Sequence, residues 1–232
     1  VGIVLLFTLI VVSSLSAQPY ITRNDNLLES NMRSSAAIHK ETITQNGYEI
    51  NTLDNDGDVG GDTAITIGAD GFGLISYYDW DNGDLKVAHC NNLTCSDAII
   101  SVVDNASDVG RYSSIAIGSD GLGIISYFDR ANVNLKVAHC DNTSCTNATI
   151  TTLDEVGAVG RYTSIIIGQN GMPLISYQDD TINEDSNLKI ARCLNIACTN
   201  ATVHTLNNLG TDDRYASMTL GTDNFWLISY LE

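Results

Sequence analysis

A unit of about 50 residues recurs along the chain and constrains its fold more than any other feature. The shared phrase occurs as ITIGADGFGLISYYD from Ile65, IAIGSDGLGIISYFD from Ile115 and IIIGQNGMPLISYQD from Ile165, with a shorter copy, MTLGTDNFWLISYLE, from Met218. The equivalent residues Ser76, Ser126 and Ser176 are 50 positions apart. A fixed period of this size indicates a repeat architecture in which each unit needs its neighbours to bury a core.

Each unit divides into four short β-branched runs separated by turn residues. In the second copy, the predicted strands are Ser114 to Gly118, Gly123 to Asp129, Asn134 to Cys140 and Ala148 to Leu153. Asp120-Gly121, between the first two runs, is a hairpin signal. No sustained helical periodicity follows the first residues of the chain. Four antiparallel strands per unit predict an all-β fold, a β-propeller with one four-stranded blade in each repeat.

The repeats set the expected domain organisation. We expect the propeller to span residues 38–232, with units at about 48–97, 98–147 and 148–200 and a partial unit at 201–232. The short last copy favours a fragment of a ring of about six to eight blades. The alternative is a closed ring of four blades, in which a hairpin of Glu41 to Gln45 and Tyr48 to Leu53, around Asn46-Gly47, completes the last blade.

The first residues have the composition of a targeting segment. VGIVLLFTLIVVSSLSA, residues 1–17, is an apolar run that ends in small residues, which predicts a secretory signal peptide cut after Ala17, followed by a linker over 18–37. The run is short for a membrane span. A retained N-terminal anchor or a pilin-like helix is the alternative.

Charge excludes some partners. The chain carries 28 acidic and 11 basic residues, a formal net charge of −17. Such a charge disfavours nucleic acid and anionic membrane surfaces, so we expect neither nucleic-acid binding nor membrane insertion of the mature domain.

The six cysteines form three pairs with four residues between the members of each pair. Even number, constant spacing and a secretory leader predict one local disulfide per repeat: Cys90 with Cys95, Cys140 with Cys145, and Cys193 with Cys198. Structural zinc is the alternative, since His89 and His139 precede the first cysteine of their pairs. Arg192 takes that position in the third copy, which argues for the disulfides.

The phrase S-[IA]-x-I-G-x-[DN]-G-x-x-x-I-S-Y-x-D resembles the repeats of secreted bacterial β-propeller proteins described as sialidase-like. The resemblance covers residues 48–232 and implies the fold. The family's Asp-box is not reproduced, because Asp70-Gly71 and Asp120-Gly121 are adjacent and no Trp follows at the required spacing. None of the sialidase catalytic residues can be placed on this chain, so no catalytic residue is predicted.

Several residues are candidates for ligand contacts, although repetition on every blade favours a structural role. They are Arg111, Arg161 and Arg214, each followed by Tyr, and the aromatic residues Trp80 and Phe128. The three-residue insertion at Asp179 to Asn187 is a further candidate, because variable loops on a rigid scaffold often carry recognition.

Two acidic loops are candidates for binding Ca²⁺, and the sequence indicates no other cofactor. Their oxygen donors are Asp54, Asp56, Asp58, Asp79, Asp81 and Asp84, on short glycine-containing segments. Neither loop fits the EF-hand pattern, and solvated turns are the alternative.

Two classes of function follow. The first is a non-catalytic secreted or cell-surface propeller that binds an extracellular glycan or protein, and we favour it because the repeats contain no asymmetric catalytic set. The second is a sialidase-like glycoside hydrolase whose catalytic residues lie outside these repeats. A spacer domain in a larger extracellular protein is a third.

Overall fold

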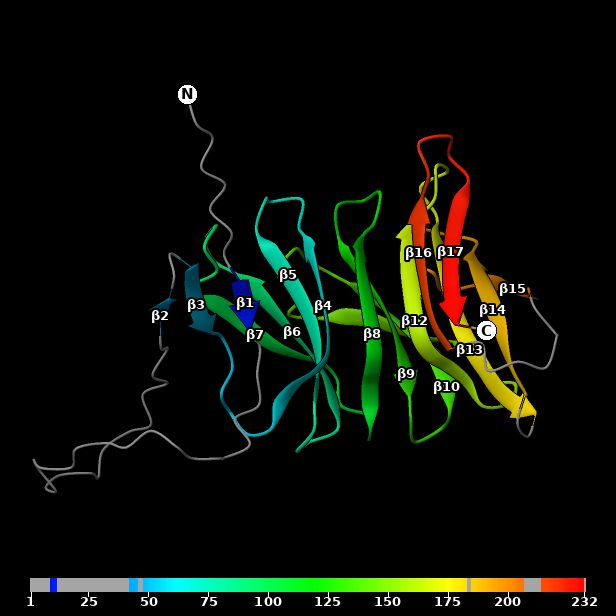
Figure 1. Ribbon diagram of the computed structural model, residues 1–232, viewed down its shortest axis with the longest axis horizontal. Helices are drawn as coiled ribbons and strands as arrows, with labels where there is room; N and C mark the ends of the chain where they lie inside the picture. The colour runs from blue at the N-terminus through cyan, green and yellow to red at the C-terminus, as the bar shows by residue number, and fades with distance from the viewer. Residues whose placement is uncertain (1–8, 12–41, 46–47, 183–184, 207–213, 232) are drawn as a thin grey trace, which may run out of the picture.

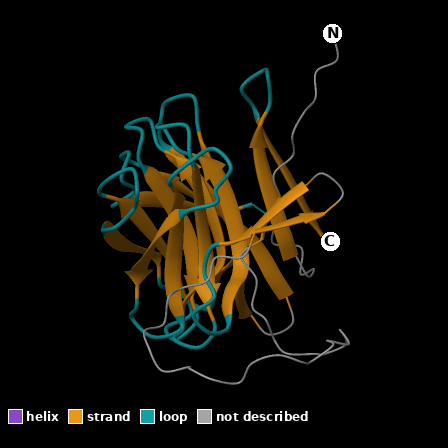
Figure 2. Cartoon of the chain, turned by 90° about the vertical axis from the view of Figure 1, so that its left-hand side faces the viewer, coloured by secondary structure: helices purple, strands orange, loops and turns teal. Residues whose placement is uncertain are grey.

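The computed structural model describes residues 9–11, 42–45, 48–182, 185–206 and 214–231, and within these ranges it contains strands and turns but no helix (Figure 2). Three complete repeats each form one four-stranded antiparallel sheet. The strands of the first sheet are β4 (Val59–Ile67), β5 (Gly73–Asp79), β6 (Asp84–Cys90) and β7 (Ala98–Asp104). Those of the second are β8 (Val109–Ile117), β9 (Gly123–Asp129), β10 (Asn134–Cys140) and β11 (Ala148–Asp154). Those of the third are β12 (Val159–Ile167), β13 (Pro173–Ile182), β14 (Asp185–Cys193) and β15 (Ala201–Thr205).

Two smaller sheets complete the described structure. β16 (Arg214–Leu220) pairs with β17 (Trp226–Leu231), and β3 (Tyr48–Thr52) pairs with β2 (Thr42–Gln45) and, in parallel, with β1 (Leu9–Val11). β1 belongs to the predicted signal peptide; the rest of that peptide and the linker lie outside the described residues. β2–β3 and β16–β17 belong to separate sheets (Figure 1), and the number of blades stays a prediction.

The sheets stand side by side, and their first strands are neighbours (Figure 1). Strand order within each sheet follows the chain, so β4, β8, β12 and β16 form the inner row and β7, β11 and β15 lie outside. This arrangement is that of β-propeller blades. The predicted all-β propeller fold is therefore confirmed.

In the second sheet two strands match the predicted ranges, β11 ends one residue later, at Asp154 rather than Leu153, and the inner strand differs most. β9 and β10 begin and end at the predicted residues, whereas β8 starts at Val109 rather than Ser114. The difference comes from a β-bulge: the register with β9 shifts between Val109 and Arg111 and again between Arg111 and Ser114. Sequence patterning missed this part of the strand because a bulge interrupts the alternation of side chains.

The core lies between consecutive sheets. Leu74 and Leu85 of the first sheet are fully buried against Ile125 and Tyr127 of the second. Burial of each such side chain contributes roughly 1.5–3 kcal/mol. Because the strands contact neighbours on both faces, their central residues are apolar on both faces, as the sequence indicated.

A buried polar network also joins each sheet to the one before it. Asp104, the last residue of β7, accepts a hydrogen bond of 2.6 Å from the hydroxyl of Tyr127. The same carboxylate forms an ion pair with Nζ of Lys136 at 2.6 Å. The third sheet repeats the arrangement with Asp154, Tyr177 and Lys189, and the first with Asp54, Tyr77 and Lys86. A buried charge is tolerated only when it is paired in this way.

The network shifts the pKa values of its members. Burial alone raises the pKa of Asp54, but hydrogen bonds from Lys86, Tyr77 and the Asp56 amide, with the charge of Lys86, lower it below its ordinary value overall. Burial and the neighbouring carboxylates raise the pKa values of Tyr77, Tyr127 and Tyr177. These tyrosines therefore stay protonated in the folded protein.

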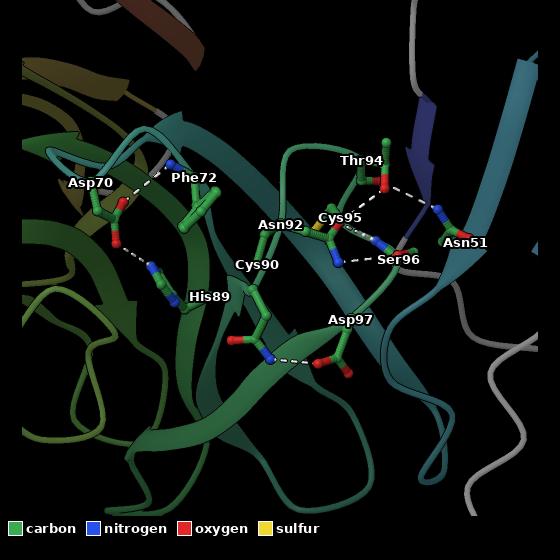
Figure 3. Close-up of a disulfide and its surroundings, with 11 residues drawn as sticks. Asn51, Asp70, Phe72, His89, Cys90, Asn92, Thr94, Cys95, Ser96 and Asp97 are labelled. Carbon is green, nitrogen blue, oxygen red and sulfur yellow. Dashed lines mark hydrogen bonds and ion pairs between the residues drawn. A yellow bond between two sulfur atoms is a disulfide. The ribbon is translucent and has the colours of Figure 1, made fainter.

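The predicted disulfides are present. Each joins the end of a third strand to the following loop, with Cα–Cα distances of 4.8 Å for Cys90–Cys95 and Cys140–Cys145 and 4.9 Å for Cys193–Cys198. Next to the first of them, the carbonyl of Thr94 accepts a hydrogen bond from Asn51, which ties β3 to the disulfide loop (Figure 3). No helix among the described residues is long and apolar enough to cross a membrane.

Candidate functional site

The strand registers define two ends of the molecule. The disulfide end carries the cysteine loops and the hairpin turns 68–72, 118–122, 168–172 and 221–225. The opposite end, which we call the tyrosine end, carries the starts of the inner strands and the loops that link one sheet to the next.

At the tyrosine end, the bulge of each inner strand aims one side chain toward its neighbours. The bulged residues are Asp62, Tyr112, Tyr162 and Tyr215, with φ values of 48°, 54°, 51° and 57°. L-residues with bulky side chains rarely adopt this left-handed conformation, which costs roughly 1–3 kcal/mol and is retained where the surroundings impose it. The recurrence of the conformation places the four side chains in one row.

The row lines a shallow cavity of about 290 Å³. The ring centroids of Tyr112 and Tyr162 are 4.4 Å apart, and those of Tyr162 and Tyr215 are 4.5 Å apart. Tyr215 is 61% exposed, so part of the aromatic surface is open to a ligand. Burial, with hydrogen bonds to the Tyr215 and Tyr112 hydroxyls, raises the pKa of Tyr162, so its phenol is a poor nucleophile at neutral pH.

Two of the predicted ligand residues meet beside this row. The guanidinium of Arg111 on β8 lies over two adjacent rings, 4.9 Å from the centroid of Tyr78 and 4.4 Å from that of Trp80. Its Nε is also 3.3 Å from Asp108. Gly61 takes the place of an arginine in the first copy, and a Cβ there would lie 2.4 Å from Nε1 of Trp80. The missing side chain therefore leaves space for Trp80, which is 46% exposed.

The other pair repeats the same contact one sheet further on. Arg161 of β12 lies 5.3 Å from the ring centroid of Phe128 and forms a 2.7 Å ion pair with Asp180. Phe128 is buried, so it supports the arginine rather than facing solvent. For Arg214 the structure describes the backbone of β16 but not the side chain. The structure therefore brings Trp80 to Arg111 and Phe128 to Arg161.

The aspartates predicted to bind Ca²⁺ have partners within the protein. Asp79 Oδ1 accepts the amides of Asp81 and Asn82 at 3.0 Å, and its Oδ2 lies 3.6 Å from Lys86. Asp54 belongs to the network with Tyr77 and Lys86.

The rest of the acidic set is more dispersed. Asp81 Oδ2 accepts the amide of Asp58, and Asp56 and Asp58 are themselves exposed. Burial and the nearby carboxylates of Asp79 and Asp104 raise the pKa of Asp84. In the described residues, no three His, Cys, Asp or Glu side chains are grouped so as to hold a metal ion. Calcium binding stays an untested prediction.

The arginines of the repeated Arg-Tyr pairs were predicted ligand contacts, whereas the tyrosines that follow them were not. The signal was visible, because Arg-Tyr recurs at 111–112, 161–162 and 214–215. What the sequence did not show was the bulge that turns each Tyr toward the next one. The insertion after Asp179 extends the β13–β14 hairpin, with Ile182 opposite Asp185, and residues 183–184 lie outside the described part of the chain.

Comparison with known proteins supports the fold. No protein-family model matches the chain, and curated protein sequences give no match. Among solved structures, a protein of unknown function from Dyadobacter fermentans aligns with a TM-score of 0.59 and 15% identity, over 76% of this chain and 50% of its own. A GH43 β-1,3-galactosidase aligns with a TM-score of 0.53 and 12% identity, over 72% of this chain and 38% of its own.

A further structural neighbour also acts on carbohydrate according to its description. An α-L-arabinofuranosidase from Fusarium graminearum, in complex with an iminosugar inhibitor, aligns with a TM-score of 0.53 and 12% identity, over 74% of this chain and 56% of its own. At these identities the likeness shows the fold alone. The chain is thus a β-propeller that spans half or less of the first two of these neighbours.

Proposed function

We propose that this protein is a non-catalytic, secreted or cell-surface β-propeller that binds a glycan at the tyrosine end. The observation that carries the proposal is the row of Tyr112, Tyr162 and Tyr215, held by bulged inner strands along one cavity. Exposed aromatic rings pack against the apolar faces of sugars, and their hydroxyls hydrogen-bond to sugar hydroxyls. The three disulfides support an oxidising, extracellular compartment.

The charges around the cavity favour binding over hydrolysis. Glycoside hydrolases of most families use two carboxylates, roughly 5–9.5 Å apart, on either side of the scissile bond. Among the described residues that line this cavity, Asp62 is the one carboxylate. Tyr162, whose raised pKa keeps it protonated, is not suited to act as a nucleophile.

Binding is tested on an array of immobilised neutral oligosaccharides, with Tyr215→Ala compared against Phe225→Ala. Both rings are exposed, but Phe225 lies at the disulfide end and leaves the cavity unchanged. We expect the wild type and Phe225→Ala to bind the same glycans, and Tyr215→Ala to lose at least tenfold in affinity, about 1.4 kcal/mol. Equal binding by the two variants, or binding to proteins but to no glycan, contradicts the proposal.

The alternative is a glycoside hydrolase, which the neighbours' descriptions and Asp62 in the cavity favour. It is tested with a panel of chromogenic aryl glycosides and with Asp62→Asn. We expect no turnover above background. Turnover that Asp62→Asn abolishes, in a variant whose circular dichroism is unchanged, replaces the binding role with an enzymatic one.

A further inference from the structure

A second cavity lies at the disulfide end, between the third sheet and the β16–β17 hairpin. Its volume is about 590 Å³, which is within the range of roughly 300–1,000 Å³ for small-ligand pockets. Among the described residues that line it, Arg192 is the one charged side chain. In a chain of net charge −17, this cavity presents a single positive group.

The repeat is broken at this cavity by two coordinated substitutions. In the first two sheets, Nε2 of His89 lies 2.8 Å from Asp70, and Nε2 of His139 lies 2.8 Å from Asp120. Figure 3 shows the first of these pairs, which joins a hairpin turn to the end of a third strand. In the third sheet, Asn170 replaces the aspartate and Arg192 replaces the histidine. The acid and its partner have changed together, which frees the basic side chain from an internal carboxylate.

The guanidinium of Arg192 lies over the ring of Trp226, and the equivalent position in the other three copies is not aromatic. Cζ of Arg192 is 5.4 Å from the ring centroid of Trp226, and Arg192 is exposed. The guanidinium of Arg192 forms no hydrogen bond or ion pair with another described residue. Cation–π contact holds the guanidinium by its face, so that its N–H edge remains available to a ligand.

Trp226 is the large aromatic residue that lines this cavity. It occupies the position of Gly123 in the second sheet, where a Cβ would already lie 2.7 Å from Cδ2 of Leu74 in the preceding sheet. The contact between the first and second sheets is therefore close at this position. At the boundary with the β16–β17 hairpin the same position carries an indole ring, which lines the cavity.

A buried hydroxyl shows independently that this boundary departs from the repeat. Ser76 and Ser126 each bond across to the next inner strand at 2.8 Å, to Ser113 and Thr163. The hydroxyl of the equivalent Ser176 has no hydrogen-bond partner in the described structure, because Ala216 takes the place of Ser113 and Thr163. The boundary is therefore not held by the polar contact that the other two have.

We propose that this cavity is a second binding site, for a sugar residue that bears a carboxylate. The guanidinium of Arg192 takes the carboxylate, since arginine donates two parallel hydrogen bonds to such a group. Trp226 supplies an apolar surface for the ring, and the side chains of Gln169, Asn170 and Asn224 line the cavity as hydrogen-bonding groups for hydroxyls. The site lies at the opposite end from the tyrosine row and does not rest on the function proposed for that row.

The experiment uses the fluorescence of Trp226 as a local reporter. The protein has two tryptophans, so a Trp80→Phe background leaves Trp226 as the single one. The probe is trigalacturonate, and its matched control is the fully methyl-esterified trisaccharide, which has the same rings without the charge. We expect a saturable fluorescence change with trigalacturonate, and at least tenfold weaker binding of the ester.

Two variants separate binding from folding. Arg192→Gln removes the guanidinium, and Asn170→Asp/Arg192→His rebuilds the pair that the first two sheets carry at 2.8 Å, so the second variant retains a native arrangement of this region. Both should bind trigalacturonate at least tenfold more weakly. The proposal is overturned if the ester binds equally well, if neither variant weakens binding, or if the Trp80→Phe protein that carries Arg192 gives no saturable change at millimolar probe. Displacement by sulfate at the same concentration as trigalacturonate also overturns it, because the site then selects an anion rather than a sugar.

Discussion

The strongest test of the fold concerns the buried contact between the first and second sheets. We predict how much the substitution Asp104→Asn lowers the free energy of unfolding. Asp104 is 8% exposed, Lys136 is 7% exposed and Tyr127 is fully buried. Substitution leaves the ammonium of Lys136 with Asp129, at 4.0 Å, as its remaining carboxylate. Removing one partner of a buried pair costs roughly 3–5 kcal/mol, and the retained Asp129 places our expectation at about 3 kcal/mol.

Two further variants provide comparisons for Asp104→Asn. Tyr127→Phe removes one hydrogen bond to a charged acceptor, worth roughly 1.5–3 kcal/mol, and leaves the ion pair intact. Asp154→Asn makes the equivalent change at the next boundary, where Lys189 remains 2.9 Å from Asp179. Because the ammonium keeps a closer partner there, Asp154→Asn should destabilise the protein less than Asp104→Asn.

The assay is equilibrium unfolding in urea, followed by far-ultraviolet circular dichroism with the disulfides intact. Glu155→Gln is the matched control, since it removes a carboxylate that is exposed to solvent. The reasoning would be refuted if Asp104→Asn lowered the free energy of unfolding by less than about 1 kcal/mol, or by no more than Glu155→Gln does. Repeat proteins can unfold in parts. A smaller m-value, the slope of unfolding free energy against urea concentration, would therefore indicate that the sheets unfold separately.

Three other predictions follow from the same structure. Gly110→Ala should lower the melting temperature more than Gly71→Ala. Both glycines have positive φ, but of the two only Gly110 would place a Cβ against backbone, 2.7 Å from Cα of Leu85. Equal decreases in melting temperature would contradict the close contact. Above about pH 10, stability should fall by roughly 4 kcal/mol per pH unit, because the pKa values of three buried tyrosines, Tyr77, Tyr127 and Tyr177, are raised in the folded state. That contribution is fully present below the unfolded pKa of tyrosine and is lost as pH rises, so complete tyrosine ionisation with an unchanged fold would be evidence against the network. Chelation with EDTA should leave the melting temperature unchanged, because the oxygens of Asp54 and Asp79 already have partners; a marked decrease would instead favour calcium.

Much of the fold was readable from the sequence because it depends on local patterns. The strands β9 and β10 were predicted to the residue, since β-branched runs bounded by Asp-Gly and by a cysteine loop fix where a strand begins and ends. The disulfides followed from spacing, because a loop of four residues brings its two cysteines within bonding reach.

The candidate sites were less readable. Arg111 and Trp80 were singled out separately, but their contact joins two sheets, and the sequence does not say which face of a strand meets which residue of the next unit. The tyrosine row depends on a bulge and on positive φ at three tyrosines, and neither has a local signature in these residue types. The cavity at Arg192 required the structure for a related reason: its residues come from four strands, two hairpin turns and a cysteine loop.

The sequence by itself determined the repeat, the strands within it and the cysteine pairing, because each follows from spacing of residues along one unit. The tertiary structure alone decided which side chains meet between units. These contacts include the buried aspartates that pair with the next sheet, the tyrosines that line one cavity, and the arginine that lies over Trp226 at the other cavity. The reason is physical: contacts between sheets depend on the register, bulges and packing of strands some 50 residues apart, and these are settled only when the sheets pack against one another.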